Sequence, residues 1–563
     1  MAKQGAFTFV LHSHIPYCRS AGRWPHGEEW IHEAAAETYI PLLRALYDLR
    51  DEGVPYQLTI GLTPILVEQL RDPLINAHLH EYLETHVQAA ADDATRFHSA
   101  GDAKLAALAD RYHASYSRLL ADYSQAFGAD LVGAFRGLQE SGHVEIATSA
   151  ATHGYLPLLD RDSSIAGQIS TGAASYEQAF GRRPRSIWLP ECAYRPPTAT
   201  AVGGAIRERP GIEQFLEEQG LRLFFTETQT IAGGRQVGKV RGDAIGPYGL
   251  LAGRGAARSS RSTRRTTFEP YFVGDSDVAV LGRNSKTGLQ VWSGEHGYPG
   301  DGWYREFHRK DEVSGLQYWR ITGRGVGMGE KAEYEPDRAA ERVRDHARHF
   351  ASLVEDEVAG NYSATGNFGI VCASYDTELF GHWWMEGVDW LREVLRLLAS
   401  SDTVQLSTAG AFVEAHPPEE AVALPESSWG QNGDHSTWLN PETEWMWPVI
   451  HAAERRMERL IQTHPNADDS AARLLAQAAR ELLLLQSSDW PFLVTTGQAR
   501  DYAVGRFQEH VARFEQLAAA LERPLSQEAV SLAEELYERD RVFGAIDYQQ
   551  FRNRESARAS VAS

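Results

Sequence analysis

The chain has 563 residues, 43% of them hydrophobic and 10% aromatic, which is enough for a large core. Its 76 Asp and Glu residues outnumber 55 Lys and Arg residues, for a formal net charge of −21. A field of that sign repels nucleic acid and anionic membranes, so we expect neither as a partner. No run approaches 18 apolar residues, which predicts that no helix crosses a membrane.

Three cysteines in so long a chain fit a reducing compartment. The N-terminal stretch also lacks the apolar segment and cleavage site of a signal peptide. We therefore expect a cytoplasmic protein, working as a monomer. Fourteen Trp and 22 Tyr residues are many, and flat rings stack well on sugar faces, so the count favours a carbohydrate or another ring-shaped ligand.

Near the N-terminus, GAFTFVLHSHIPY predicts a buried strand that ends at His12 and His14. A helix is predicted over 28–53, and YQLTIGLTPILVEQL predicts a second strand running into a helix. Residues 68–142 have a long, polar, helical pattern. Because this is more helix than one strand–helix unit needs, it predicts a helical insertion.

Five more strand-like segments follow, several separated by helical stretches: 143–150, 186–191, 221–227, 277–283 and 368–376. Strands that alternate with helices predict a parallel sheet or barrel of the α/β class. Ionisable residues stand at predicted strand ends, namely His12, His14, Glu191 and Asp376. Since the carboxyl ends of parallel barrel strands meet on one face, we expect these side chains to share a site.

Residues 229–276 differ from their surroundings, because they are rich in Gly, Ser and Arg and have little periodicity. They predict a long mobile loop. Its arginines form the one basic cluster in the sequence, and either pair with nearby acids in a solvated loop or bind a ligand: Arg254, Arg258, Arg261, Arg264 and Arg265.

Helical patterns return from about 445 to 540. We expect a catalytic domain over 1–410, a C-terminal helical domain over 411–545 and a frayed tail over 546–563. The segment SSWGQNGDHSTWLNPETEWMW, residues 427–447, sets tryptophans among Gly, Asn and Ser. Such a polar stretch makes a poor core, so its rings either face a groove or pack in the ordinary way.

Two acidic residues stand out by their surroundings. Glu191 lies in IWLPECAYRPP, and Asp376 begins DTELFGHWWMEG, where Glu378 and Trp384 crowd behind it. Glycosidic bond cleavage requires such a carboxylate pair, one acting as nucleophile or base and the other as acid. The alternative is that each acid pairs with an arginine or caps a helix.

The sequence HSH places the imidazoles of His12 and His14 on the same side of a strand. They could bind zinc together with a carboxylate, orient sugar hydroxyls as neutral donors, or support the core. His153, in ATHGYLP, is a further candidate for hydroxyl contacts. No phosphate-binding loop, dinucleotide fingerprint, CxxC pair or G-x-S-x-G motif is present.

Five motifs in order resemble glycoside hydrolase family 57 and, within it, the 1,4-α-glucan branching enzymes: HSHIPY, GHVEIATSAATHGYLPLL, WLPECAY, YDTELFGHWWMEG and the late tryptophan segment. The resemblance covers nearly the whole chain. It implies an incomplete (β/α)7 TIM-like barrel with a helical insertion and a C-terminal helical domain. It also implies retention through a glycosyl-enzyme intermediate, with neither a metal nor a cofactor.

By motif position, the resemblance implies that Glu191 is the nucleophile and Asp376 the general acid/base. The residues that it implies for substrate binding are His12, His14, His153, Trp292, Trp429 and Trp438. We also expect Arg283 and Trp384 to contact the glucan. The family has a loop whose tip tyrosine covers the site. Tyr248 is the best positional match and Tyr271 is the rival, while the Arg-rich piece 254–267 is an extra insertion.

These assignments predict an enzyme that cleaves an α-1,4-glucan and transfers the segment to a glucose 6-hydroxyl, with minor hydrolysis. The near alternatives are an α-amylase, if water is the acceptor, and a 4-α-glucanotransferase, if a 4-hydroxyl is. A zinc-dependent deacetylase or mannosidase built around HSH is a remote enzymatic alternative. A glucan-binding protein with a lapsed site is the non-enzymatic one.

Overall fold

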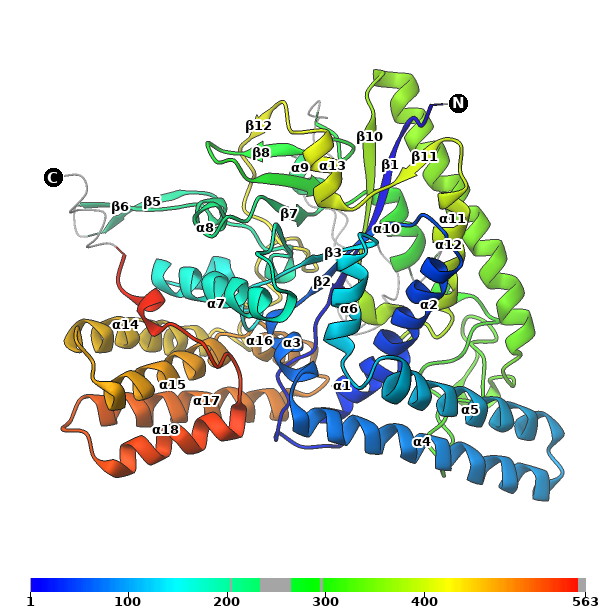
Figure 1. Cartoon of the computed structure of the whole chain (residues 1–563), viewed down its shortest axis with the longest axis horizontal. Coiled ribbons are helices and arrows are strands. Elements are labelled where there is room, and N and C mark those ends of the chain that lie inside the picture. Colours follow the sequence, from blue (N-terminus) through cyan, green and yellow to red (C-terminus); the bar gives the residue numbers. More distant parts are fainter. Residues whose placement is uncertain (1, 203–204, 233–264, 294–296, 555–563) are drawn as a thin grey trace.

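The computed structural model describes residues 2–202, 205–232, 265–293 and 297–554 (Figure 1). These residues form a helix-rich, mixed α/β structure, which agrees with the predicted α/β class. Tyr248 and most of the arginine cluster lie outside the described residues. Within the described part, no helix is both long enough and apolar enough to cross a membrane.

The first sheet has the strand order β10 (Gly369–Asp376), β1 (Gly5–Ser13), β2 (Leu58–Leu62), β3 (Val144–Ala147), and β11 (Val404–Leu406) also pairs with β1. All of these pairings are parallel. Every residue of β1 and of β10 is buried. Parallel strands covered on both faces require such continuous apolar runs, which is why the sequence pattern located these two strands well.

The second sheet has the order β12 (Ala421–Val422), β8 (Tyr271–Val273), β9 (Ala279–Gly282), β7 (Leu223–Thr226), β4 (Ser186–Ile187). Its pairings are parallel except for β8 with β9. A parallel bridge between Thr148 and Ile187 joins it to the first sheet. On the other side, the Asn284 amide, just past β9, donates to the Cys372 carbonyl of β10 at 2.8 Å. A separate hairpin is formed by β5 (Thr198–Val202) and β6 (Ala205–Arg209).

Helices connect and cover these strands: α1 (Glu28–Ala34), α2 (Ile40–Asp51), α3 (Pro64–Leu70), α6 (Leu131–Glu140), α7 (Asp162–Phe180), α8 (Ile212–Glu218), α9 (Thr228–Ala232), α10 (Ser285–Trp292), α11 (Pro336–Thr365), α12 (Gly387–Ala399) and α13 (Ala409–Ala415). In α12, Leu391, Val394, Leu395 and Leu398 are buried. Their spacing of three and four residues puts them on one helix face, so this helix is held by its apolar stripe.

The region predicted as a helical insertion contains two long helices, α4 (Pro73–Ala100) and α5 (Ala103–Ala121), which lie side by side at the lower right of Figure 1. The Asp72 carboxylate caps α4 by accepting from the amides of Leu74 and Ile75. Gly101, with φ of 75°, ends the same helix in the left-handed conformation. The helical pattern is therefore confirmed, while its status as an inserted unit stays a prediction.

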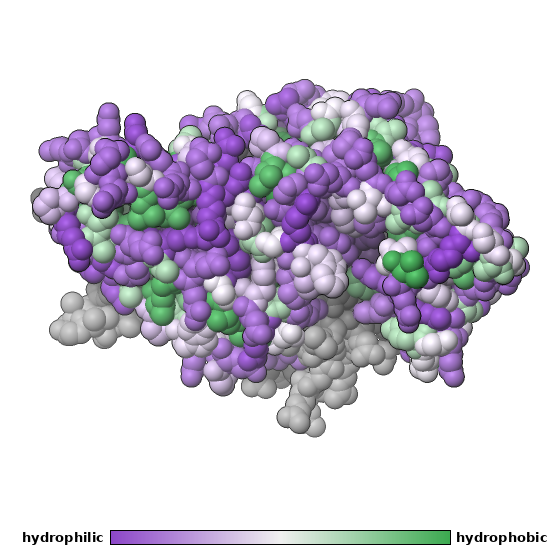
Figure 2. Space-filling view, turned by 90° about the horizontal axis from the view of Figure 1, so that it is seen from below, coloured by the Kyte–Doolittle hydropathy of each residue, from purple (hydrophilic) through white to green (hydrophobic). Residues whose placement is uncertain are grey.

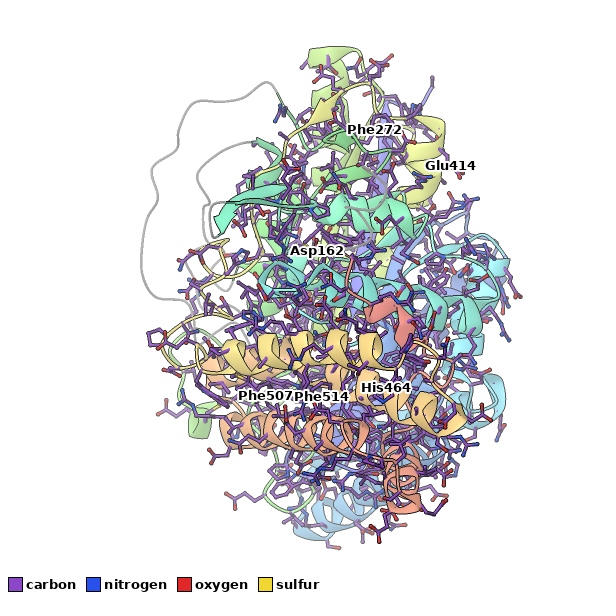
Figure 3. The ribbon with its side chains drawn as sticks, turned by 90° about the vertical axis from the view of Figure 1, so that its left-hand side faces the viewer. Asp162, Phe272, Glu414, His464, Phe507 and Phe514 are labelled. Carbon is purple, nitrogen blue, oxygen red and sulfur yellow. The ribbon has the colours of Figure 1, made fainter. Side chains whose placement is uncertain are left out.

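The C-terminal helices are α14 (Met446–Thr463), α15 (Asp469–Leu485), α16 (Asp489–Thr496), α17 (Arg500–Leu521) and α18 (Gln527–Asp540). Phe507 and Phe514, seven residues apart on α17, are buried where this helix meets α14 (Figure 3). The predicted helical character of this region is confirmed. The face seen in Figure 2 is mainly hydrophilic, and its apolar residues form small separate groups.

Two predictions about irregular segments are corrected. The tail does not begin at 546, because a 3-10 turn (Tyr548–Phe551) packs on α7, and a Cβ at Gly167 would lie 2.3 Å from the buried Phe551 ring. Similarly, the loop predicted over 229–276 includes α9 and β8. Tyr271 lies in β8, is buried and accepts a hydrogen bond from the Thr266 amide at 2.9 Å, so it is not a loop-tip residue.

Candidate functional site

A cavity of about 220 Å³ lies at the carboxyl ends of β1 and β10. Six of the predicted site residues line it together: His12, His14, His153, Glu191, Asp376 and Trp429. They come from positions spread over more than four hundred residues of the chain. His12, His14, Glu191 and Asp376 come from the ends of β1, β4 and β10 or just after them, as predicted, and His153 and Trp429 come from connecting segments. Apolar and aromatic side chains complete the wall, among them Trp30, Trp383 and Phe492.

The register between β1 and β10 sets the first pair of groups. His12 and Asp376 are direct partners on these neighbouring parallel strands. One residue further along, the hydroxyls of Ser13 and Thr377 hydrogen-bond at 2.7 Å. This contact continues the pairing beyond the strand ends, so it fixes how the imidazole of His12 and the carboxyl of Asp376 stand beside each other.

Glu191 has an unusual backbone conformation. The chain leaves β4 and turns through Pro190–Cys192, where Glu191 has φ of 60° and ψ of 24° and Cys192 has φ of 49°. Left-handed backbone is costly for residues with a side chain and persists only where the surroundings impose it. Here the Trp429 amide donates to the Glu191 carbonyl at 2.9 Å. In this conformation the side chain of Glu191 lines the cavity.

The carboxyl of Glu191 is held by donors on both oxygens. Trp429 Nε1 donates to Oε2 at 2.6 Å, and the Ser488 hydroxyl donates to Oε1 at 3.4 Å. Burial raises the pKa of Glu191 to about 7, and the charges of Asp376 and Asp489 act in the same direction, against the hydrogen bond from Trp429. The carboxyl group is thus held in one orientation, with a pKa near neutral pH.

The three histidines divide into two kinds. Burial lowers the pKa of His12 and of His153, and the charge on His14 lowers both further. Burial would lower the pKa of His14 too, but the charge and hydrogen bond of Asp489, 2.9 Å from Nε2, outweigh it and raise that pKa. His14 therefore holds a proton more readily than an exposed histidine, and His12 and His153 hold one less readily.

His14, His153 and Asp489 also offer ligand atoms within 4.8 Å of one another, close enough to hold a metal ion. Their nitrogens already have protein partners: His14 contacts the Thr63 hydroxyl at 3.0 Å, and His153 contacts His12 at 3.2 Å and Ser488 at 2.9 Å. The nitrogens of His14 and His153 are therefore engaged within the protein, whereas the buried Nδ1 of His12 has no hydrogen-bond partner among the described residues.

Sequence reasoning missed two polar groups of this site, Ser488 and Asp489, and gave no role to a third, Glu378. Ser488 and Asp489 reach it from the start of α16, and Glu378 lies behind Asp376. The Glu378 carboxylate accepts from the amide of His14 at 3.1 Å and from the hydroxyl of Tyr39, and burial raises its pKa to about 7. The usable signal for the first two was the polar QSSD inside the apolar run ELLLLQSSDWPFLV.

Four predicted substrate contacts lie elsewhere. Trp438 is fully buried and stacks on Tyr155 with ring centroids 4.4 Å apart, and Trp384 is buried against other aromatic rings. Arg283 is paired with Glu227 at 2.8 Å, and the partly buried Trp292 has its ring 6.3 Å from that of Tyr375. None of the four lines the cavity. Of the adjacent residues Trp383 and Trp384, it is Trp383 that lines it.

The chain matches the family model for glycosyl hydrolase family 57 over residues 8–425 and that for the 1,4-alpha-glucan branching enzyme C-terminal domain over 449–551. It is 48% identical over 549 residues to a 1,4-alpha-glucan branching enzyme of Thermococcus kodakarensis, covering 96% of this chain and 78% of that one. The crystal structure of that enzyme superposes with a TM-score of 0.88 over 98% of this chain and 97% of the other.

Two further solved structures are similar. A family 57 branching enzyme of Pyrococcus horikoshii shares 44% identity and a TM-score of 0.87, covering 98% of this chain and 97% of that one. The alpha-amylase AmyC of Thermotoga maritima shares 27% identity and a TM-score of 0.80, covering 97% and 99%. The chain therefore shares its fold with branching enzymes and with an alpha-amylase.

Proposed function

The chain belongs to glycosyl hydrolase family 57, and on that premise we propose that it forms its α-1,6 branches with Glu191 and Asp376 as the catalytic pair. It is a 1,4-alpha-glucan branching enzyme, a transglycosidase acting on α-glucans. The observation that supports the pair most directly is the cavity where both carboxyls meet the three histidines. Retaining glycosidases use two carboxyl groups in this way.

In the first step, Glu191 attacks the anomeric carbon of an α-1,4-linked glucose. The bond from that carbon to the 4-oxygen of the next glucose breaks, and Asp376 gives its proton to that oxygen. The leaving segment departs with a free 4-hydroxyl, and the donor segment becomes a β-linked ester of Glu191. The donors on both oxygens of Glu191 hold it in place for this attack.

In the second step, Asp376 takes the proton of an acceptor hydroxyl, whose oxygen attacks the same anomeric carbon. The ester bond to Glu191 breaks, which restores both carboxyl groups and the α configuration. If the acceptor is the 6-hydroxyl of another glucan segment, the product is a branch. Water would give hydrolysis and a 4-hydroxyl would give a linear transfer product, so the chemistry is common and the acceptor determines the activity.

Branching is tested by incubating the enzyme with amylose and counting new linkages. We expect proton NMR to show α-1,6 linkages accumulating well beyond new reducing ends, because each transfer forms one branch and only leakage to water creates a reducing end. Reducing ends in excess, with few α-1,6 signals, would identify an amylase instead. Longer linear chains without either change would identify a 4-α-glucanotransferase.

Trp429→Phe tests how Glu191 is kept ionised. Removing the indole N–H takes away a donor to the charged carboxylate, so the pKa of Glu191 rises further. Because the nucleophile must be ionised, the acid limb of the pH profile of kcat/KM should move to higher pH, by about one unit for a charge-assisted bond of about 1.5 kcal/mol. The loss is expected to be larger at pH 6 than at pH 9, and an equal loss at both would contradict this role.

Finer features of the family are also proposed for this chain. The two sheets would be parts of one incomplete (β/α)7 barrel, which the Thr148–Ile187 bridge and the Asn284–Cys372 hydrogen bond support. The domain division at 410 and 411 and the roles of Trp292, Trp438, Arg283 and Trp384 in the glucan groove stay predictions. So do a covering loop with Tyr248, a monomeric state and a cytoplasmic location.

A further inference from the structure

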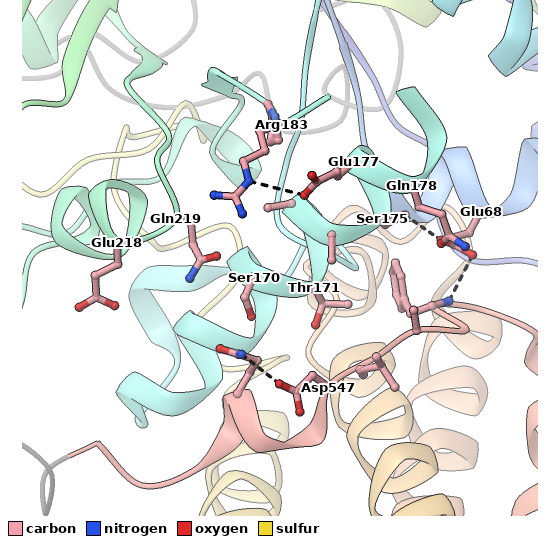
Figure 4. Close-up of a pocket in the computed structure, with 17 residues that line it drawn as sticks. Glu68, Ser170, Thr171, Ser175, Glu177, Gln178, Arg183, Glu218, Gln219 and Asp547 are labelled. Atoms are coloured by element: carbon pink, nitrogen blue, oxygen red, sulfur yellow. Dashed lines mark hydrogen bonds and ion pairs between the residues drawn. The ribbon is translucent and has the colours of Figure 1, made fainter. Parts of the chain in front are cut away.

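A second cavity, of about 430 Å³, lies where the segment after α18 crosses α7 (Figure 4). It shares no lining residue with the catalytic cavity. Its volume falls within the range of ligand pockets, roughly 300–1,000 Å³. We propose that this groove is a second glucan-binding site, which holds a segment of the same polymer away from the reacting bond. The proposal rests on the proposed function, because it takes the ligand to be an α-glucan.

The side chains around the groove suit a ligand rich in hydroxyl groups. Figure 4 shows hydroxyl, amide, carboxylate and guanidinium groups on its sides: Ser170, Thr171, Glu177, Gln178, Arg183, Gln219 and Asp547. Planar amide and carboxylate groups can hydrogen-bond two neighbouring hydroxyls of a sugar at once. The lining also includes the apolar side chains of Ala173, Ala174 and the partly buried Ile546, which can contact the C–H faces of sugar rings.

The charges in the groove select a neutral ligand. Four carboxyl residues line it, Glu68, Glu177, Glu218 and Asp547, against a single cation, Arg183. That arginine already lies 3.7 Å from Glu177, and Glu218 accepts from Arg554 at 2.6 Å. A phosphate-bearing ligand would meet this excess of negative charge, whereas an uncharged glucan would not.

One polar group at the wall of the groove has no hydrogen-bond partner among the described residues. It is the hydroxyl of Thr171, a residue that is 6% exposed and lines the groove. A buried polar group left without a partner costs about 1–3 kcal/mol. The Thr171 oxygen itself is closed off from solvent, so a sugar hydroxyl in the groove can supply the missing bond only when this side chain rotates toward it. The unmatched hydroxyl at the wall of the groove is the observation that points to a bound polyol.

The groove is also preformed. The Glu68 carboxylate connects two of its walls: it accepts from the Ser175 hydroxyl of α7 at 2.7 Å and from the backbone amide of Phe543, in the segment after α18, at 3.2 Å. Further along, Phe551 is buried against Gly167. A site whose walls are fixed before binding loses less conformational freedom when the ligand arrives.

A polymeric substrate makes a second site useful. Glucan held at the groove raises the effective concentration of chain ends and of 6-hydroxyls near the catalytic cavity, as in any two-site binder. Short oligosaccharides cannot reach both places. The groove should therefore affect the handling of long glucans and leave the reaction of short ones unchanged.

The test measures how strongly the full-length enzyme is retarded in native gels that contain glycogen. Thr171→Val, Arg183→Ala and Ala174→Leu remove the free hydroxyl, remove the cation and fill the groove, respectively. Each is expected to weaken the apparent affinity by about 2- to 10-fold, the equivalent of one to two hydrogen bonds. Turnover of a maltooligosaccharide too short to span both sites should remain within 2-fold of the parent enzyme, roughly the scatter expected of independent sites.

Arg182→Ala is the matched control, because Arg182 is the exposed neighbour of Arg183 and does not line the groove. It should bind glycogen like the parent enzyme. Thr171→Val should also keep the parent Tm, since it removes a hydroxyl that has no partner. Unchanged retardation in all three groove variants, or equal loss in Arg182→Ala, would overturn the proposal. Because binding is read without turnover, a failure of the branching activity would be seen separately.

Discussion

Replacing Glu191 by glutamine is expected to lower branching and hydrolysis together, by on the order of 10⁴-fold or more, as loss of a nucleophile does in other enzymes. Glutamine keeps the size of the side chain and can still accept from Trp429 Nε1, so the cavity should survive. Activity is measured by linkage formation on amylose and by reducing-end release. Near-normal turnover in this variant would remove Glu191 from the mechanism.

The Tm of the Glu191→Gln variant distinguishes loss of catalysis from loss of folding. Burial raises the pKa of Glu191 to about 7, above the value of an exposed glutamate, so the folded protein binds this proton more tightly than the unfolded chain. Keeping the carboxylate charged above pH 7 therefore costs folding free energy, and the cost disappears below the unfolded pKa. Glu191→Gln should have a Tm at pH 8 equal to or above that of the parent enzyme.

Replacing Asp376 by asparagine is expected to lower kcat by on the order of 10²- to 10⁴-fold, the usual contribution of a general acid and base. The loss should be largest with poor leaving groups, such as the sugar 4-oxygen of amylose, and smaller with an activated α-maltosyl fluoride. Protonation assists departure of the first far more than of the second. Equal losses on both substrates would argue against an acid role.

Azide distinguishes the two roles by stereochemistry. With α-maltosyl fluoride, Glu191→Ala should yield the β-glycosyl azide, because azide enters from the face left empty by the nucleophile. Asp376→Ala still forms the ester on Glu191 and should yield the α-glycosyl azide. The opposite result would exchange the two assignments. Glu378→Gln is the matched control, since Glu378 is a buried carboxyl of the same cavity with a similar pKa and no assigned chemistry.

Strand-end residues were the part of the site that the sequence made predictable. His12 and Asp376 terminate two fully buried strands, and continuous apolar runs are the strongest local signal that a sequence carries. Parallel strands in turn have all their carboxyl ends on one edge. The pairing of His12 with Asp376 in the register of β1 and β10 is the outcome that this reasoning anticipates.

Residues from loops and helices were less predictable. Ser488 and Asp489 start α16, and only the docking of the C-terminal helices places them beside Glu191 and His14. No local pattern encodes such a contact between residues about three hundred positions or more apart. Trp438 shows the opposite difficulty: the polar, glycine-rich sequence around it allowed either an open groove or ordinary packing, and its ring is fully buried against Tyr155.

The contribution of α16 to the cavity has a consequence for how the enzyme is made. A ribosome releases the chain from its N-terminus, at about 5–20 residues per second, and early parts begin to fold while later parts are still being synthesised. The two carboxyls that we propose as the catalytic pair, Glu191 and Asp376, are synthesised more than one hundred residues before Ser488 and Asp489. We therefore expect the nascent chain to hold an incomplete pocket, and cleavage of glucan to begin only after synthesis has passed α16 and this helix has docked.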